Sequence, residues 1–263
     1  MTASPDPGTH QAGPESLGLT AQIRACLFDL DGVLTETAKI HAAAWKDTFD
    51  GFLRTYCAQH GKPFQAFDEV KDYEVYVDGK PRADGIRSFL KSRDITLPDG
   101  QDGDPPTAET VQGLGNAKNT AFTEILDKKG VDAFEGSVRY VKAVREANLR
   151  CAVVTSSANC HAVLKAAGLD GYFDATVDGS DLKPLGLRGK PAPDTFLAAA
   201  RKLGVEPAEA AVYEDALAGV EAGRAGRFGR VIGVDRLGQA DALREHGADV
   251  VVTDLGDLLS TNR

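Results

Sequence analysis

Short apolar segments rich in β-branched residues recur along the chain and predict the strands of a sheet. Five strands are expected, at residues 23–30, 150–156, 210–215, 230–235 and 248–255. Each is a brief and nearly continuous apolar run, which is typical of parallel strands that are buried on both faces. The pattern therefore predicts a buried parallel sheet.

Segments with helical spacing of apolar residues separate most of these strands. Three helices are expected, at residues 137–148, 159–168 and 193–204. The last of them has a proline near its start and a glycine at its end, which are common boundary residues of a helix. Alternating strands and helices predict an α/β fold with a Rossmann-like parallel sheet flanked by helices.

A mainly helical region interrupts this alternation directly after the first strand. Residues 37–129 contain two long helical stretches, with a shorter helical piece and an acidic loop rich in Gly and Pro between them. A segment of about 90 residues suffices for a small domain. We therefore expect a helical cap domain at 37–129 on a core formed by residues 23–36 and 130–263. Residues 1–22, which are rich in Pro, Gly and Ser, are expected to be a flexible tail.

Composition narrows the classes of partner and location. The net charge of −9 and the pI of about 5.1 disfavour a nucleic acid partner, whereas a basic pocket for a small anion remains compatible with them. The four scattered cysteines show no metal-binding spacing, which favours a reduced, cytoplasmic protein. No apolar run is long enough for a membrane span and the N-terminus does not resemble a secretory signal. A monomer or weak dimer is expected.

Polar residues gather where three of the predicted strands end, and one lysine lies between the second and third of these strands. Ligands of open parallel sheets bind at this edge. The candidate residues there are Asp29, Asp31, Thr155, Ser156, Ser157, Lys190, Glu214 and Asp215. Clustered carboxylates require a cation, and hard oxygen ligands suit Mg²⁺, while hydroxyls and free N–H groups suit a phosphate. The edge thus predicts phosphoryl transfer, with one aspartate as nucleophile and the other as acid or base.

Four ordered segments resemble the motifs of the haloacid dehalogenase family of phosphatases and phosphomutases. They are FDLDGVLTET, VVTSS, GKPAPDTF and VYEDALAG, and the resemblance covers roughly residues 23–255. It implies the fold of that family, with Asp29 as the nucleophile that becomes an aspartyl phosphate and Asp31 as general acid and base. Thr155 and Lys190 are the further catalytic candidates. The implied Mg²⁺ ligands are Asp29, the Asp31 carbonyl and Asp215, with Glu214 as a ligand or a partner of one.

Segments of the predicted cap resemble the β-phosphoglucomutase subfamily more closely. They are TETAKIHAAAWK, DGKPRADGI and GNAKN, together with TSSAN in the core. The resemblance implies a sugar phosphate substrate bound by Thr37, His41, Trp45, Gly79, Lys80, Arg82, Lys118, Ser156, Ser157, Ala158 and Asn159, with Asn119 beside Lys118. The sequence departs from the subfamily at Ala158, where a lysine is expected, and at Gly85, where a serine is expected. The segment before Lys190 is also a few residues longer.

Other interpretations of these residues remain open. Thr155 and Ser157 also suit a helix cap, Trp45 also suits the interior of the cap, and His41 also suits a structural role. Three functions are therefore considered. The first is a Mg²⁺-dependent mutase that interconverts β-D-glucose 1-phosphate and glucose 6-phosphate through an aspartyl phosphate and a glucose 1,6-bisphosphate. The second is a phosphatase of a small sugar or polyol phosphate, and the third is a non-catalytic binding protein.

Overall fold

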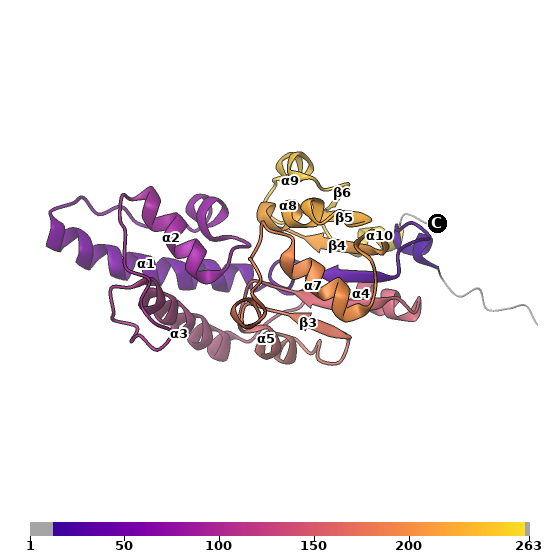
Figure 1. Cartoon of the computed structure of the whole chain (residues 1–263), viewed down its shortest axis with the longest axis horizontal. Coiled ribbons are helices and arrows are strands. Elements are labelled where there is room, and N and C mark those ends of the chain that lie inside the picture. Colours follow the sequence, from indigo (N-terminus) through magenta and orange to yellow (C-terminus); the bar gives the residue numbers. More distant parts are fainter. Residues whose placement is uncertain (1–12, 261–263) are drawn as a thin grey trace, which may run out of the picture.

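A six-stranded parallel sheet forms the centre of the molecule in the computed structural model, which describes residues 13–260 (Figure 1). The strand order is β3-β2-β1-β4-β5-β6. The strands are β1 (Ala25–Phe28), β2 (Arg150–Val154), β3 (Ala175–Val177), β4 (Ala210–Glu214), β5 (Arg230–Val234) and β6 (Val250–Val252). The α/β fold and the parallel sheet predicted from the sequence are confirmed. β3 was not predicted, because it is a three-residue edge strand whose first two residues are only partly buried.

Helices cover both faces of the sheet. One face packs against α4 (Glu135–Glu146) and α5 (Cys160–Ala166), and the other packs against α7 (Asp194–Leu203) and α8 (Leu217–Ala225). The remaining short elements of the core are α6 (Leu182–Leu185), η3 (Pro207–Glu209), α9 (Ala240–His246) and α10 (Asp257–Ser260). The three helices predicted between strands thus exist, with boundaries shifted by one or two residues.

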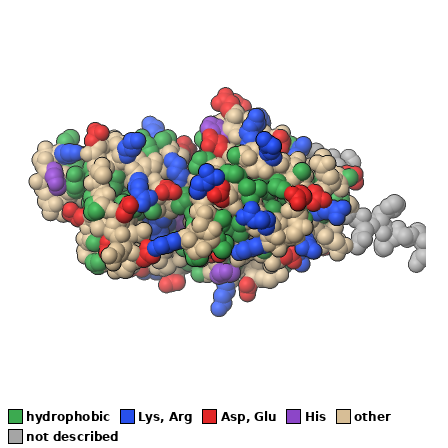
Figure 2. Space-filling model, viewed as in Figure 1, with side chains coloured by type: hydrophobic (Ala, Val, Ile, Leu, Met, Phe, Trp, Pro, Cys, Tyr) green, Lys and Arg blue, Asp and Glu red, His purple; other side chains and the backbone are tan. Residues whose placement is uncertain are grey.

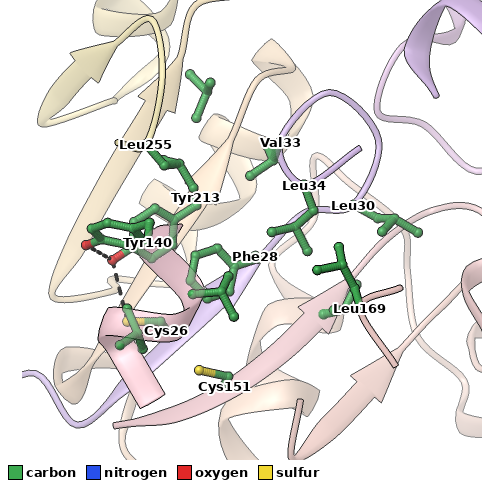
Figure 3. Packing of buried hydrophobic residues seen from close by; sticks show 14 of the residues in the cluster. Cys26, Phe28, Leu30, Val33, Leu34, Tyr140, Cys151, Leu169, Tyr213 and Leu255 are labelled. Atoms are coloured by element: carbon green, nitrogen blue, oxygen red, sulfur yellow. Dashed lines mark hydrogen bonds between the residues drawn. The ribbon is translucent and has the colours of Figure 1, made fainter. Parts of the chain in front are cut away.

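Aromatic packing anchors β1, the strand that leads into the predicted site. Phe28 stacks on Tyr213 of β4 with ring centroids 4.4 Å apart. The Tyr213 hydroxyl lies 2.8 Å from that of Tyr140 in α4 and 3.5 Å from the Cys26 sulfur (Figure 3). Since these side chains are fully buried, their hydroxyls satisfy one another instead of reaching water. The packing holds β1 firmly between β2 and β4.

The helices inserted after β1 lie beside the sheet and contain a hydrophobic cluster of their own (Figure 1). These elements are α1 (Ala38–His60), η2 (Tyr73–Val77), α2 (Arg82–Ser92) and α3 (Val111–Lys129), and η2 is a single turn of π-helix. Trp45 stacks on Phe49 in the interior of this cluster, and Phe89 packs against Phe49 with its ring tilted by 38°. We refer to α1, η2, α2, α3 and their connections as the cap.

The N-terminal segment differs from its prediction where the structure describes it. Residues 1–12 of the predicted tail lie outside the described residues, whereas η1 (Pro14–Leu17) packs against the core. Leu17 and Leu19 are 2% and 5% exposed, and the Tyr140 hydroxyl donates to the Leu17 carbonyl at 2.8 Å. Burial of the two leucines stabilises this segment on the core, although its Pro- and Gly-rich composition predicts a flexible one. The flexible tail therefore does not extend through residues 13–22.

The four cysteines are free and buried. Lys and Arg side chains are interspersed with Asp and Glu side chains on the face shown in Figure 2. Among residues 13–260, no helix combines the length and the apolar character needed to cross a bilayer.

Candidate active site

The carboxyl end of β1 continues into a tight loop that holds two aspartates. Asp29 follows the strand directly, and its N–H donates to the Tyr213 carbonyl at 2.9 Å. Gly32 has φ of +87°, and a Cβ there would lie 1.8 Å from an Asp215 carboxylate oxygen. A larger residue would therefore be strained and would also displace Asp215. The glycine lets the loop after β1 approach the end of β4 closely.

Lys190 joins the acids at the ends of β1 and β4. Its ammonium lies 2.5 Å from Asp29 Oδ1 and 2.5 Å from Glu214 Oε1, and it donates to the Val154 carbonyl at 3.0 Å. Burial alone would lower the pKa of Lys190, but the two carboxylates outweigh burial and raise it. Lys190 is therefore a buried cation held by two acids.

Replacement of Lys190 by Met is expected to destabilise the fold. The Lys190 side chain is 1% exposed, so its loss leaves two buried carboxylates without their cation. Such losses typically lower the free energy of unfolding by about 3–5 kcal/mol. Urea unfolding of the variant measures the change, and Lys142→Met on the exposed face of α4 serves as the control. A decrease no larger than that of the control would show that Lys190 does not stabilise this cluster.

Glu214 lies behind the cavity rather than on its surface. Its side chain is 1% exposed, and its Oε2 accepts from the Ala216 N–H at 3.1 Å. A Cβ on Gly219 would lie 1.8 Å from Glu214 Oε1, so the glycine leaves room for this carboxylate. Glu214 thus pairs with Lys190 and does not face the cavity.

Asp31 is surrounded by hydrogen-bond donors from the core and the cap. Thr37 Oγ1 donates to Asp31 Oδ1, His41 Nε2 lies 3.2 Å from the same oxygen, and Thr155 Oγ1 donates to Oδ2 at 3.2 Å. Burial would raise the pKa of Asp31, but His41 and Thr37 outweigh burial and lower it. These donors therefore favour the ionised form of Asp31.

The spacing of residues on α1 and α3 produces this arrangement. Thr37 and His41 are four residues apart and so share one face at the start of α1. Lys118 of α3 reaches His41 from the other side, with its Nζ 2.5 Å from His41 Nδ1, while His41 stacks on Phe122. Burial and Lys118 lower the pKa of His41, which favours a neutral ring that accepts from Lys118 and donates to Asp31. Burial also lowers the pKa of Lys118, to about 7.

The loop after β2 connects the core to the cap. Ser156 Oγ donates to the Gly79 carbonyl at 2.7 Å, and Asn159 Nδ2 donates to Asn119 Oδ1 at 3.1 Å. The Ser157 N–H donates to Thr155 Oγ1 at 3.0 Å, so the threonine caps its own loop as well as contacting Asp31. The same loop therefore contacts both Asp31 and the cap.

Arg82 and Lys80 extend from the cap loop in different directions. Arg82 donates to Asn119 Oδ1 at 2.8 Å and to the Gly115 carbonyl at 3.1 Å. The Lys80 ammonium turns toward its own segment and donates to the Val75 carbonyl at 2.9 Å. Arg82 is thus fixed between α2 and α3.

A cavity of about 350 Å³ lies between the cap and the carboxyl end of the sheet. Most of the predicted site residues line it, namely Asp29, Asp31, His41, Trp45, Gly79, Lys80, Arg82, Lys118, Thr155, Ser156, Ser157, Ala158 and Asp215. Thr37, Asn159, Lys190 and Glu214 do not line it, but each contacts a residue that does. Sequence reasoning missed Tyr73 and Asp78, which also line the cavity. Asp78 could have been noticed because it directly precedes the predicted loop glycine, whereas no sequence signal marked Tyr73.

The acids at the end of the sheet fit a divalent cation. One oxygen each from Asp29, Glu214 and Asp215 lie within 4.8 Å of one another. Burial and neighbouring carboxylates raise the pKa of Asp215, and among the described residues no side chain donates to its carboxylate. The pKa of Asp29 is also raised, by burial and despite Lys190. Three buried carboxylates thus share one lysine, and oxygen ligands of this kind suit Mg²⁺.

Comparison with known proteins is consistent with this geometry. The family model of haloacid dehalogenase-like hydrolases matches residues 23–227, which include the loop after β1, Lys190 and the end of β4. The chain belongs to this family. The resemblance of the four motifs to haloacid dehalogenases is therefore confirmed.

Two curated relatives and one solved structure show which members of the haloacid dehalogenase-like family this chain resembles. It is 55% identical to a β-phosphoglucomutase of Mycobacterium bovis over 92% of this chain and 94% of that protein. It is 32% identical to a β-phosphoglucomutase of Bacillus subtilis over 90% and 92% of the two chains. A solved β-phosphoglucomutase of Clostridium difficile shares the fold with a TM-score of 0.71, at 24% identity over 90% and 93% of the chains. The family member is thus an enzyme of phosphoryl transfer and is similar to β-phosphoglucomutases.

Proposed function

We propose that the enzyme is a phosphomutase that interconverts β-D-glucose 1-phosphate and glucose 6-phosphate through a glucose 1,6-bisphosphate. The single observation that carries this proposal is the contact of Asp31 with both the cap and the core. Asp31 Oδ1 lies 3.2 Å from Nε2 of His41 in α1, and Asp31 Oδ2 accepts from Thr155 after β2 at 3.2 Å. A proton-transfer group held in this way is correctly placed only when the cap covers the cavity. The 55% identity to a β-phosphoglucomutase supports the same assignment.

Asp29 is the proposed nucleophile. One of its carboxylate oxygens bonds to the phosphorus of a bisphosphate while the bond from phosphorus to the sugar oxygen breaks. The departing oxygen takes the proton that Asp31 accepted from the attacking hydroxyl in the other half of the cycle, and an aspartyl phosphate remains. The Asp29 carboxylate keeps its orientation because Lys190 holds Oδ1 at 2.5 Å.

The second half of the cycle reverses these roles. A hydroxyl of the bound sugar monophosphate attacks the aspartyl phosphate, the bond from Asp29 to phosphorus breaks, and Asp31 accepts the hydroxyl proton. The ionised state of Asp31 suits this step. His41 and Lys118 keep Asp31 ionised until the proton arrives. When bound by Asp29, the Asp31 carbonyl and Asp215, Mg²⁺ would neutralise the charge of the transferring phosphoryl group.

The cap determines whether the phosphoryl group goes to sugar or to water. Ser156, Asn159 and the exposed Lys183 of the core each bond to a cap residue, the last through a 2.6 Å ion pair with Asp102. These contacts hold the cap against the core, and a cap held there limits the access of water to the aspartyl phosphate. This arrangement supports a mutase rather than a phosphatase.

A coupled assay tests this proposal. The enzyme is supplied with β-D-glucose 1-phosphate, Mg²⁺ and a trace of glucose 1,6-bisphosphate, and glucose 6-phosphate is followed with glucose-6-phosphate dehydrogenase while inorganic phosphate is measured in parallel. We expect glucose 6-phosphate as the main product and no turnover of the α-anomer. Stoichiometric release of inorganic phosphate in place of glucose 6-phosphate would identify a phosphatase instead.

A further inference from the structure

One carboxylate in the cavity has no role in the mechanism above. Asp78 follows η2 in the cap and lines the cavity together with the core acids Asp29, Asp31 and Asp215. It thus adds negative charge to the side of the cavity that already holds the catalytic acids. The position of Asp78 therefore raises the question of which part of a ligand in the cavity it contacts.

Contacts of the neighbouring glycine fix the position of Asp78. The Gly79 carbonyl accepts from Ser156 Oγ at 2.7 Å, and a Cβ on Gly79 would lie 2.9 Å from that of Ala216. Gly79 also has φ of +67°, which other residues rarely adopt. The cap loop therefore touches the core loops after β2 and β4 directly, and this contact places Asp78 opposite the core acids.

The other polar contacts of Asp78 come from the cap itself. The buried Tyr73 hydroxyl donates to its carboxylate. Lys80 lies two residues away and also lines the cavity, and its ammonium donates to the Val75 carbonyl at 2.9 Å. Burial and the charge of Glu214 raise the pKa of Asp78 to about 7. Asp78 therefore lines the cavity beside the buried Tyr73.

The charges of the cavity show which part of the substrate Asp78 meets. A phosphate beside Asp78 would be repelled by this carboxylate. Arg82 and Lys118 supply positive charge elsewhere in the same cavity. The part of a sugar phosphate that faces Asp78 is therefore the uncharged ring, whose hydroxyls are donors that a carboxylate binds well.

We propose that Asp78, oriented by Tyr73, accepts hydrogen bonds from ring hydroxyls of the substrate and thereby selects the sugar. This inference rests on the proposed function, because it assumes a hexose phosphate in the cavity. Asp78 is a specificity-determining residue in this account, and it takes no part in proton transfer to the reacting oxygens.

Deoxy sugars test this inference. The values of kcat/KM are compared for β-D-glucose 1-phosphate and its 2-, 3- and 4-deoxy analogues. We expect the unmodified enzyme to discriminate against at least one analogue by about 10- to 100-fold, because that analogue leaves Asp78 without a donor. In Asp78→Asn, the kcat/KM for β-D-glucose 1-phosphate is expected to lie within about threefold of that for this analogue. The kcat/KM ratios for the other analogues are expected to stay unchanged. Tyr73→Phe is expected to reduce the discrimination against the first analogue by a smaller factor and provides the test if Asp78→Asn does not fold.

Asp84→Asn is the matched control, since Asp84 is an exposed acid of the same cap that pairs with Arg87 at 3.0 Å outside the cavity. Its ratios should equal those of the unmodified enzyme. Equal loss on every sugar in Asp78→Asn, or a higher Mg²⁺ requirement with unchanged ratios, would overturn the inference. The ratios are measured from whichever product forms, sugar phosphate or inorganic phosphate. A failure of the mutase assignment is therefore seen in the unmodified enzyme and is distinguishable from a failure at Asp78.

Discussion

Replacement of Asp29 by Asn is expected to abolish turnover while the fold is kept. The amide is close to isosteric with the carboxylate, but it is a poor nucleophile toward phosphorus, so the aspartyl phosphate cannot form. We expect kcat to fall by about 10⁴-fold or more, as for the loss of other covalent nucleophiles. The coupled assay with glucose 1,6-bisphosphate measures this loss.

Binding of glucose 6-phosphate by the Asp29→Asn variant distinguishes loss of the chemical step from loss of the fold. The amide oxygen of the variant can still accept a hydrogen bond from Lys190, so calorimetric binding of glucose 6-phosphate should remain within about tenfold of the unmodified enzyme. Glu206→Gln, an exposed change near β4, is the control for general effects of removing an acid. Residual turnover above about one per cent of the unmodified rate would contradict the role of Asp29 as the nucleophile.

Replacement of Asp31 by Asn is expected to slow the mutase reaction by about 10²- to 10⁴-fold, which is the usual contribution of general acid–base catalysis. The sugar oxygen is a poor leaving group, and it departs slowly without a proton from Asp31. A phosphoryl donor with a good leaving group, such as acetyl phosphate, does not need this proton. The variant should therefore accept a phosphoryl group from acetyl phosphate at a rate within about tenfold of the unmodified enzyme.

The two donors together distinguish acid–base catalysis from a structural role. Thr37, His41 and Thr155 surround the Asp31 carboxylate, so a purely structural residue would affect both donors equally. Equal losses with acetyl phosphate and with glucose 1,6-bisphosphate would exclude the proposed proton transfer by Asp31.

The sheet and the acids at its edge could be predicted because their signals are local. Buried parallel strands are short apolar runs, and Asp29 and Asp215 stand where two of those runs end. β3 was missed because three edge residues, two of them only half-buried, do not form such a run. Residues 13–22 were misjudged because the burial of Leu17 depends on Tyr140, which is 123 residues away in the chain.

The cap could be predicted only in part. Its helices were visible from periodicity, whereas the approach of Lys118 to His41 joins residues 77 positions apart and followed only from resemblance to a family. Asp78 lies in a segment whose contact with the core depends on the packing of Gly79 against Ala216. Such contacts arise from tertiary structure, which single-sequence patterns do not contain.

The central claim is that Asp29 accepts the phosphoryl group covalently. The most direct test is to quench the enzyme during turnover with glucose 1,6-bisphosphate, reduce it with borohydride and sequence the peptide of residues 25–37. Reduction converts an aspartyl phosphate into homoserine. The account predicts homoserine at position 29 and unchanged aspartate at position 31. Aspartate at both positions, with the phosphoryl group recovered on Thr155 or Ser156, would contradict it.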